Sequence, residues 1–220
     1  VAMQTRKSGD YIYRVEQPSI AMGNTGKATV MTVSTISPWF GPLCLAADLL
    51  IVHLLSEHDL LPILTERKQR GLPVIYELSD NITAPHEGVG IKGWFSDPVN
   101  LALAFQYMRL ADAVQVTGPG LAQRFNFINP RTIIFPNQIA VMGSLDRPDT
   151  GRVTIGWAGS SGHIRDVESV IDIVASLIQA HPQVDFALMS DEKIHRLWAA
   201  ALLERPIDSS PPGPLAAYLD

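Results

Sequence analysis

Residues 153–178 run Val153-Thr-Ile-Gly-Trp-Ala-Gly-Ser-Ser-Gly-His-Ile-Arg-Asp-Val-Glu-Ser-Val-Ile-Asp-Ile-Val-Ala-Ser-Leu-Ile178. This order predicts a buried strand, then a glycine-serine turn, then a long amphipathic helix. The helix is indicated by apolar residues at helical spacing, namely Ile164, Val167, Val170, Ile171, Val174, Leu177 and Ile178. Such a unit presents the free backbone N–H groups of a helix start beside a loop, which is a common phosphate-binding arrangement in α/β proteins. The sequence therefore predicts a phosphate-bearing ligand.

The turn itself supplies the candidate phosphate-binding residues. We expect Gly159, Ser160, Ser161 and Gly162 to surround a phosphate with backbone N–H groups and hydroxyls. The two serines are also candidate N-caps of the helix. His163 stands at the positive end of the helix, which disfavours its cationic form and leaves a neutral donor. Two simpler interpretations stay open: a tight turn that needs glycine for its backbone alone, and a histidine that caps the helix or faces solvent.

Composition excludes several classes of protein. With 220 residues, of which 46% are hydrophobic and 18% charged, the chain has the make-up of a globular protein with a substantial core. A net charge of −5 without a lysine-arginine run argues against a nucleic-acid partner. The single Cys44 rules out an internal disulfide and fits a reducing compartment. The longest apolar stretch, 43–55, contains Asp48 and His53 and is shorter than the ~20 residues of a membrane span. We expect a cytoplasmic protein, and peripheral contact with the inner face of the membrane stays open.

Strand-like and helix-like segments alternate along the chain, which predicts parallel sheets with helices between the strands. The expected strands are 28–34, 48–55, 73–80, 113–117, 132–135, 153–159 and 184–189, and the expected helices are 57–70, 99–111, 121–125, 164–178 and 192–204. We predict an α/β fold of two Rossmann-like, doubly wound sheets. The first domain covers 1–140, a linker covers 141–152, and the second domain covers 153–220. With only two clear strands and an irregular tail after 205, the second domain is expected to be truncated.

Four segments together suggest a family. In order, they are Pro73-Val-Ile-Tyr-Glu-Leu-Ser-Asp80, Ala111-Asp-Ala-Val-Gln-Val-Thr117, Ile134-Phe-Pro-Asn137, and Ile155-Gly-Trp-Ala-Gly-Ser160 with His163 and Asp166. In order and spacing they resemble the group 1, retaining glycosyltransferases of the GT-B fold. The resemblance runs across nearly the whole chain. It implies transfer of a sugar from a nucleotide diphosphate sugar, in the synthesis of a cell-surface polysaccharide or glycolipid.

The resemblance also implies roles for particular residues. The turn 159–162 would face the diphosphate of a UDP or GDP type donor, which is a substrate and not a tightly bound cofactor. The first domain would supply the acceptor surface, including Tyr13 and Arg14. The acceptor, whether glycan, lipid or protein, stays open. The basic pair and the Glu-x7-Glu pair that the family carries in its second domain are not found before Asp220. The resemblance thus implies a fragment that lacks half of its donor site and is inactive alone.

Further candidates follow from position. Asp80 ends a buried strand at the carboxyl edge of the predicted sheet, where α/β proteins place ligands, so Asp80 and Glu77 are the catalytic candidates. The alternative for Asp80 is ordinary turn chemistry. If the strand stays regular to its end, Glu77 points to the opposite face from Asp80. His86 lies in the long segment 81–98 and is a candidate acceptor contact or a solvated loop residue. Asp191 follows the second strand of the second domain and is a candidate donor-side acid.

No metal site is predicted. His53, His58 and Asp59 are spread over a turn, whereas zinc needs three or four converging ligands.

Other classes of protein remain open at this point. A nicotinamide-dependent Rossmann enzyme would need G-x-G-x-x-G, but the glycines here stand at Gly156, Gly159 and Gly162. An epimerase built on the same two domains is a second enzyme alternative. A non-catalytic module that binds a nucleotide or a sugar, or an interaction domain, is compatible with the same fold.

Overall fold

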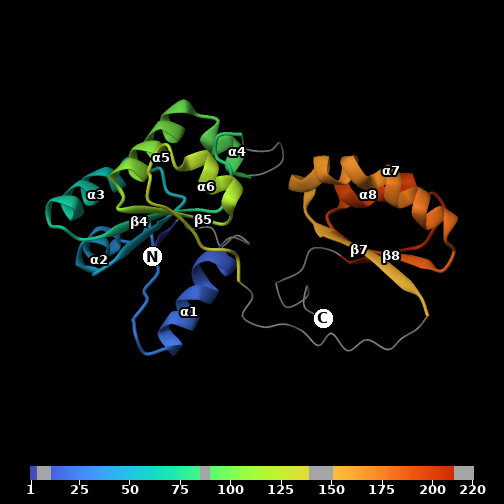
Figure 1. The fold of residues 1–220 in the computed structure, drawn as a ribbon, viewed down its shortest axis with the longest axis horizontal. Helices are drawn as coiled ribbons and strands as arrows, with labels where there is room; N and C mark the ends of the chain where they lie inside the picture. Colours follow the sequence, from blue (N-terminus) through green and yellow to red (C-terminus); the bar gives the residue numbers. More distant parts are fainter. Residues whose placement is uncertain (4–10, 85–89, 139–150, 211–220) are drawn as a thin grey trace. The chain divides into compact units, whose positions relative to one another are not determined.

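The computed structural model describes residues 1–3, 11–84, 90–138 and 151–210. The chain divides into two compact units, and the described residues up to 138 belong to the first while 151–210 belong to the second. Each unit has its own sheet, in which all the described strand pairs are parallel (Figure 1). The prediction of an α/β fold with two parallel sheets is therefore confirmed.

The first unit contains a six-stranded sheet in the order β2-β1-β3-β4-β5-β6. Its strands are β1 (Ala2–Met3), β2 (Val33–Ser34), β3 (Leu50–His53), β4 (Val74–Leu78), β5 (Ala113–Val116) and β6 (Thr132–Ile134). Its helices are the π-helix η1 (Tyr11–Glu16), α1 (Gln17–Asn24), α2 (Phe40–Ala46), α3 (Leu60–Gln69), α4 (Gly90–Phe95), α5 (Pro98–Leu110) and α6 (Pro119–Phe125). Helices α3 and α5 lie on one face of the sheet and α1 lies on the other, as a doubly wound sheet requires (Figure 1).

The core of the first unit follows from strand alternation. Val74, Tyr76 and Leu78 of β4 are buried together with Val114 and Val116 of β5. Tyr76 pairs with Val114 in the sheet, so these side chains share one face. Burying apolar surface of this kind contributes roughly 25 cal/mol per Å² and fixes the face on which the helices pack.

Several predicted bounds were too long. The strand expected over 28–34 is only Val33–Ser34, and the strand expected over 48–55 ends at His53. The residues that follow β3 form a loop because other hydrogen bonds use their backbone carbonyls. Tyr76 Oη donates to the Leu55 carbonyl at 2.9 Å, and Tyr107 Oη donates to the Glu57 carbonyl at 2.5 Å. The helix expected from residue 57 accordingly begins at Leu60.

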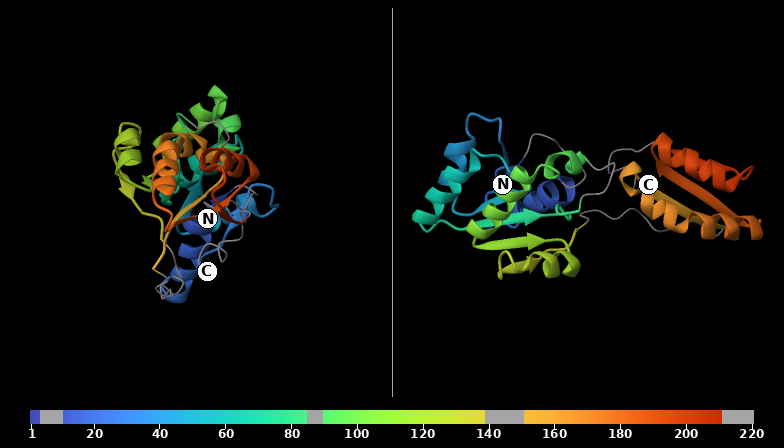
Figure 2. Two further views of the ribbon diagram at one scale, coloured as in Figure 1. Left: turned by 90° about the vertical axis from the view of Figure 1, so that its right-hand side faces the viewer. Right: turned by 90° about the horizontal axis from the view of Figure 1, so that it is seen from above.

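The second unit has three parallel strands in the order β7-β8-β9, which are β7 (Val153–Gly159), β8 (Val184–Ser190) and β9 (Ile207–Ser210). A 3₁₀ turn η2 (Ser161–His163) leads into α7 (Ile164–Ala180), and α8 (Glu192–Leu202) follows β8. The two helices pack against each other on one face of the sheet (Figures 1 and 2). The core beneath them includes Val167, Phe186, Leu188 and Trp198.

Three expectations for this unit were wrong. The strand expected to be buried, β7, lies at the edge of the sheet, and each of its residues is exposed or half-buried. The tail after residue 205 contains a third strand, β9, which was missed because Ile207-Asp-Ser-Ser210 is short and mostly polar. It forms by pairing with β8, not by its own propensity. The expected capping by Ser160 or Ser161 is also absent: the N-cap position of α7 is His163, no side chain caps it, and Ser160 makes no capping bond to η2.

One buried cation ties three segments of the first unit together. Arg67 of α3 is fully buried, and its guanidinium donates to the carbonyls of Cys44 at 2.7 Å, Ala47 at 2.8 Å and Pro73 at 2.8 Å. These carbonyls belong to the end of α2, the segment before β3 and the residue before β4. The bonds therefore set where the two strands start.

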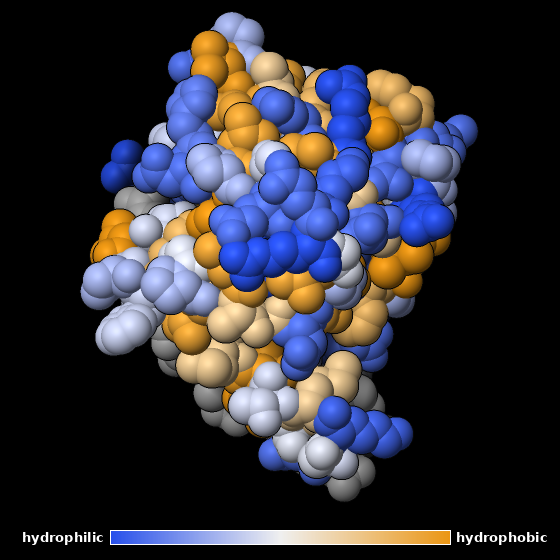
Figure 3. Space-filling model, turned by 90° about the vertical axis from the view of Figure 1, so that its left-hand side faces the viewer, coloured by the Kyte–Doolittle hydropathy of each residue, from blue (hydrophilic) through white to orange (hydrophobic). Residues whose placement is uncertain are grey.

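The surface on the α3 side of the first unit is largely polar: hydrophilic side chains form a patch at the centre of that face (Figure 3).

No helix of the described residues is long and apolar enough to cross a membrane.

Replacing Arg67 with Met should destabilise the chain by about 2–4 kcal/mol, because buried carbonyls lose their donors. Urea unfolding followed by circular dichroism measures the difference. The matched control is Arg70→Met on the same helix, where the lost partner is an exposed i,i+4 ion pair with Glu66, and we expect less than about 1 kcal/mol. Equal losses in the two variants would contradict the structural role of Arg67.

Candidate functional site

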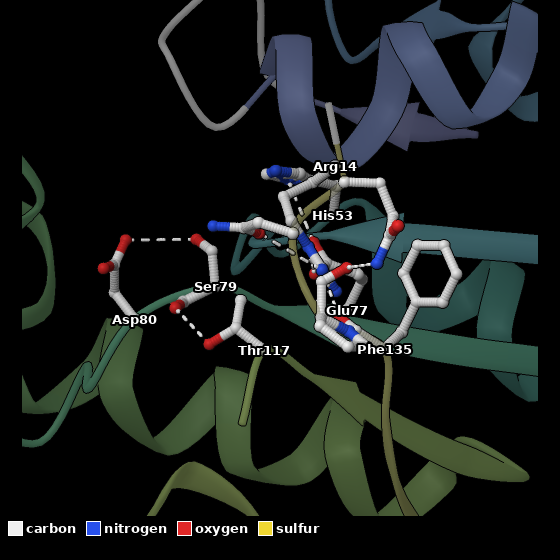
Figure 4. Close-up of polar contacts among 10 residues, drawn as sticks. Arg14, His53, Glu77, Ser79, Asp80, Thr117 and Phe135 are labelled. Atoms are coloured by element: carbon white, nitrogen blue, oxygen red, sulfur yellow. Dashed lines mark hydrogen bonds and ion pairs between the residues drawn. The ribbon is translucent and has the colours of Figure 1, made fainter. Parts of the chain in front are cut away.

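Three polar side chains meet at the carboxyl edge of the first sheet (Figure 4). His53 is the last residue of β3 and pairs in register with Glu77 of β4, while η1 supplies Arg14. Arg14 Nε lies 2.6 Å from Glu77 Oε1, and His53 Nδ1 lies 3.6 Å from Glu77 Oε2. The side chains of Arg14 and Glu77 are each 1% exposed and that of His53 is 7% exposed. We call this group the Arg14–His53–Glu77 cluster.

Arg14 also connects the cluster to the segment after β6. Its Nη1 donates to the carbonyl of Phe135 and, at 3.3 Å, to Oδ1 of Asn137. The guanidinium carbon lies 5.2 Å from the centre of the Phe135 ring, within cation–π range. The Pro136-Asn137 pair and Glu77, which stand in two different motifs of the sequence, are thus joined through one arginine.

The histidine of the cluster is neutral. Burial, together with the smaller effect of the nearby charge of Arg14, lowers the pKa of His53 to about 4. At neutral pH the contact of His53 with Glu77 is therefore not an ion pair, and Arg14 is the cation that faces the carboxylate.

The two predicted catalytic carboxylates are separated by the structure. Glu77 is buried in the cluster, whereas Asp80 lies two residues beyond β4 and is exposed. Asp80 accepts a hydrogen bond from Ser79 Oγ at 3.0 Å, and Thr117 Oγ1 donates to the Ser79 carbonyl at 3.3 Å (Figure 4). Asp80 is thus the carboxylate that a ligand at this edge can reach. Tyr13 is half-buried and precedes Arg14 in η1, while His86 lies outside the described residues.

The predicted donor residues gather at the carboxyl edge of the second sheet. Ser161 N–H donates to Asp191 Oδ2 at 2.5 Å, and Ser190 Oγ donates to the Gly159 carbonyl. Asp191 also N-caps α8, because its Oδ1 accepts from the Ile194 N–H at 3.3 Å. These bonds fasten the turn after β7 to the turn after β8.

The role of Asp191 bears on the phosphate hypothesis. Burial raises the pKa of its carboxyl, but hydrogen bonds led by the backbone N–H of Ser161 and of Ile194 outweigh that effect, and the net pKa is lowered. One of the N–H groups expected to bind a phosphate, that of Ser161, therefore already donates its hydrogen bond to a carboxylate. A phosphate at this turn has to compete for the Ser161 N–H or bind through its neighbours.

The remaining turn residues are accessible. Ser160 is exposed, and the side chain of His163 is 61% exposed and lies 2.9 Å, Nδ1 to Oδ2, from that of Asp166. A Cβ added to Gly159 would lie 3.4 Å from Trp157 Nε1 and 3.6 Å from His163 Cδ2, which is close but ordinary contact. The absence of a side chain at 159 therefore keeps the backbone open beside His163.

Sequence reasoning missed two features of these sites. His53 was considered only as a metal ligand, although its place at the end of a predicted strand put it at the same edge as Glu77. Asp191 was considered as a ligand contact, although an aspartate immediately before a predicted helix is a strong N-cap signal. Within the residues that the structure describes, no group of three or more His, Cys, Asp or Glu side chains could hold a metal ion.

Comparison with known proteins identifies the fold class. No model of a protein family matches the chain, and no curated protein sequence matches it. Among solved structures, TarM is similar over 80% of this chain, with a TM-score of 0.52 and 14% identity. A Listeria monocytogenes protein assigned as a UDP-N-acetylglucosamine 2-epimerase is similar over 99% of this chain, with a TM-score of 0.54 and 10% identity.

The chain spans 37% of TarM and 70% of the Listeria protein. At these identities the similarity concerns the fold, which is that of the GT-B class with two Rossmann-like domains.

Replacing Glu77 with Gln should destabilise the chain by about 3–5 kcal/mol, because the buried guanidinium of Arg14 loses its counter-charge. Asp80→Asn is the matched control on the same segment, and we expect a change within about 0.5 kcal/mol. Chemical denaturation measures both. A loss for Glu77→Gln no larger than that of the control would show that the buried pair does not stabilise the unit.

Replacing Asp191 with Ala should cost about 1–2 kcal/mol above pH 5, since a cap and a bond between two turns are lost. The folded-state pKa of Asp191 is depressed, so its contribution is present above the unfolded pKa of about 4 and is lost as pH falls through the folded pKa.

The stability difference between wild type and Asp191→Ala should therefore shrink in acid, as measured by thermal unfolding across pH 2–7. Asp166→Ala, which removes an exposed carboxylate, serves as the control. A difference that stays constant down to pH 2 would contradict the assignment.

Proposed function

We propose that the chain belongs to an enzyme that transfers a sugar from a nucleotide diphosphate sugar to an acceptor, and that its second unit binds the diphosphate. The observation that carries the proposal is the strand-turn-helix of residues 153–178, which supplies the first strand and helix of the second unit's parallel sheet. In such sheets ligands bind at the carboxyl ends of the strands, and Gly159 to His163 stand at that end of β7. One similar structure is assigned as an enzyme that acts on a nucleotide sugar, which supports this class of ligand.

The diphosphate would be bound by backbone and side-chain donors at the start of η2 and α7. Ser160 is exposed there, and His163 supplies a ring nitrogen at the same surface. Catalysis would consist mainly of stabilising the departing diphosphate by N–H groups that are already oriented. Asp191 would fix the geometry of the turn and not contact the ligand, since it is bonded to Ser161 and Ile194.

The first unit would bind the acceptor or the reacting sugar at the carboxyl edge of its sheet. Asp80 is the exposed carboxylate there, and Ser79 holds it by a hydrogen bond. In this proposal Asp80 orients a sugar hydroxyl, and Tyr13 lines the same surface beside Arg14. Glu77 is a positioning residue, because it is buried against Arg14.

A second candidate is an epimerase of a nucleotide sugar. It is favoured by the 99% of this chain that is similar to the Listeria protein. The two activities differ in their products: a transferase joins the sugar to a second molecule, whereas an epimerase returns a nucleotide sugar of the same mass. Mass spectrometry and proton NMR of the reaction mixture distinguish them.

Calorimetric titration of the 220-residue chain with UDP, GDP, ADP and their diphosphate sugars tests the proposal. We expect saturable binding of at least one nucleotide.

Gly159→Ala should weaken the affinity for that nucleotide about 3–10-fold, because the added methyl group narrows the approach to the backbone between Trp157 and His163. Absence of binding by every nucleotide would overturn the donor assignment.

The matched control is Gly156→Ala on the same strand, where nothing lies within 4 Å of an added Cβ. Its affinity should stay within about twofold of wild type, which is under half a kcal/mol. Equal weakening in both variants, or none in either, would place the nucleotide away from the turn.

A further inference from the structure

Two nitrogen atoms of the Arg14–His53–Glu77 cluster lack a hydrogen-bond partner among the described residues. They are Arg14 Nη2 and His53 Nε2, and both are shielded from solvent. Counted over the whole residue, Arg14 is 5% exposed and His53 is 7% exposed. Buried polar atoms are nearly always paired, and leaving one unpaired costs about 1–3 kcal/mol. Two unpaired nitrogens on neighbouring side chains indicate a group that the described residues do not themselves supply.

The two atoms have opposite hydrogen-bonding character. A guanidinium nitrogen can only donate. His53 is neutral, so one ring nitrogen carries the proton and the other accepts. The Glu77 carboxylate lies 3.6 Å from Nδ1 and favours the proton on that nitrogen, which leaves Nε2 as the acceptor. A single group that pairs with both nitrogens must therefore accept from Arg14 and donate to His53. A hydroxyl does both, whereas a phosphate or carboxylate would meet the lone pair of Nε2.

The backbone beside His53 is held in an uncommon conformation. Leu54 has φ of 52°, in the left-handed region that side chains other than glycine seldom adopt. Its N–H donates to the Glu77 carbonyl at 3.1 Å, and Trp94 Nε1 donates to Ser56 Oγ at 2.5 Å. Strain that neighbouring contacts maintain is typical of functional sites. Here the Leu54 conformation and its bond to Glu77 fix the backbone at the end of β3, the strand that carries His53.

The cluster lies at the margin of the core. The bonds from Arg14 Nη1 to Phe135 and Asn137 are only partly buried, and exposed Asp80 follows at the same edge of the sheet.

We propose that Arg14 and His53 form a hydroxyl-binding subsite that takes one hydroxyl of a sugar at the carboxyl edge of the first sheet. As a sugar subsite, this inference rests on the proposed function and names the group that the first unit recognises. Glu77 positions both side chains, since its two carboxylate oxygens face Arg14 Nε and His53 Nδ1. An enclosed water would occupy the same place in the free protein, and the sugar hydroxyl would displace it.

The imidazole nitrogens of His53, observed by long-range ¹H–¹⁵N NMR of the 220-residue chain at pH 7, test the proposal. The probes are glucose, galactose, mannose and N-acetylglucosamine, each alone and as its UDP or GDP sugar. We expect the free protein to show the Nδ1–H tautomer, and at least one probe to shift the Nε2 resonance as that atom accepts a new hydrogen bond. No shift with any probe at saturation would overturn the subsite. A shift produced equally by inorganic phosphate would overturn it in favour of an anion site.

A variant pair tests the same claim by affinity. His53→Phe keeps a ring but removes the acceptor, and we expect it to weaken the responding sugar about 3–10-fold while UDP or GDP binds within about twofold of wild type. His58→Phe, at an exposed position of the following loop, should change neither affinity. Unchanged sugar affinity in His53→Phe would contradict the proposal. If that variant does not fold, the NMR titration of the wild-type chain is the deciding test.

The two proposals fail separately. If nucleotides bind but no sugar moves the His53 resonance, the subsite is wrong and the donor assignment stands. If a free sugar moves that resonance but no nucleotide binds, the donor assignment is wrong.

Discussion

A carboxylate buried on a central strand constrains the first unit. Glu77 of β4 is almost completely removed from solvent, and an ionised carboxylate in such a place requires a cation and further hydrogen bonds. Arg14 meets that need from η1 and continues to the backbone and side chain beyond β6. One ion pair thus joins the ends of strands that are far apart along the chain, and it sets the geometry of the sheet edge where α/β proteins bind ligands.

In the second unit, a carboxylate at the edge of the sheet is stabilised by backbone N–H groups. The carboxylate of Asp191 accepts hydrogen bonds from the backbone N–H groups of Ser161 and Ile194, and it connects the turn after β7 to the start of α8. The two edges therefore differ in what they offer a ligand. The first has an exposed aspartate next to a buried arginine and a buried neutral histidine, and we propose that it binds hydroxyl groups. The second presents a helix start with an exposed serine and histidine, which suits a diphosphate.

The sequence predicted the parts of this arrangement that depend on local pattern. The alternation of strand-like and helix-like segments predicted parallel sheets, and the strand and helix of 153–178 lie where they were expected, although the strand is not buried. The expected opposite orientation of Glu77 and Asp80 does not apply, because β4 ends at Leu78, two residues before Asp80. Bounds set by tertiary hydrogen bonds were not predictable: the strand before residue 34 was overextended, and β9 exists only because β8 pairs with it. The Arg14–Glu77 pair joins positions 63 residues apart, and no pattern within one segment could reveal it.

The central claim is that a nucleotide diphosphate binds at the start of η2 and α7, and its location is most directly tested by backbone amide NMR. Spectra of the isotope-labelled chain would be recorded during titration with the nucleotide that binds. The largest saturable shifts should fall on the amides of Ser160, Ser161, Gly162 and His163. Saturable shifts confined to residues away from this turn would contradict it.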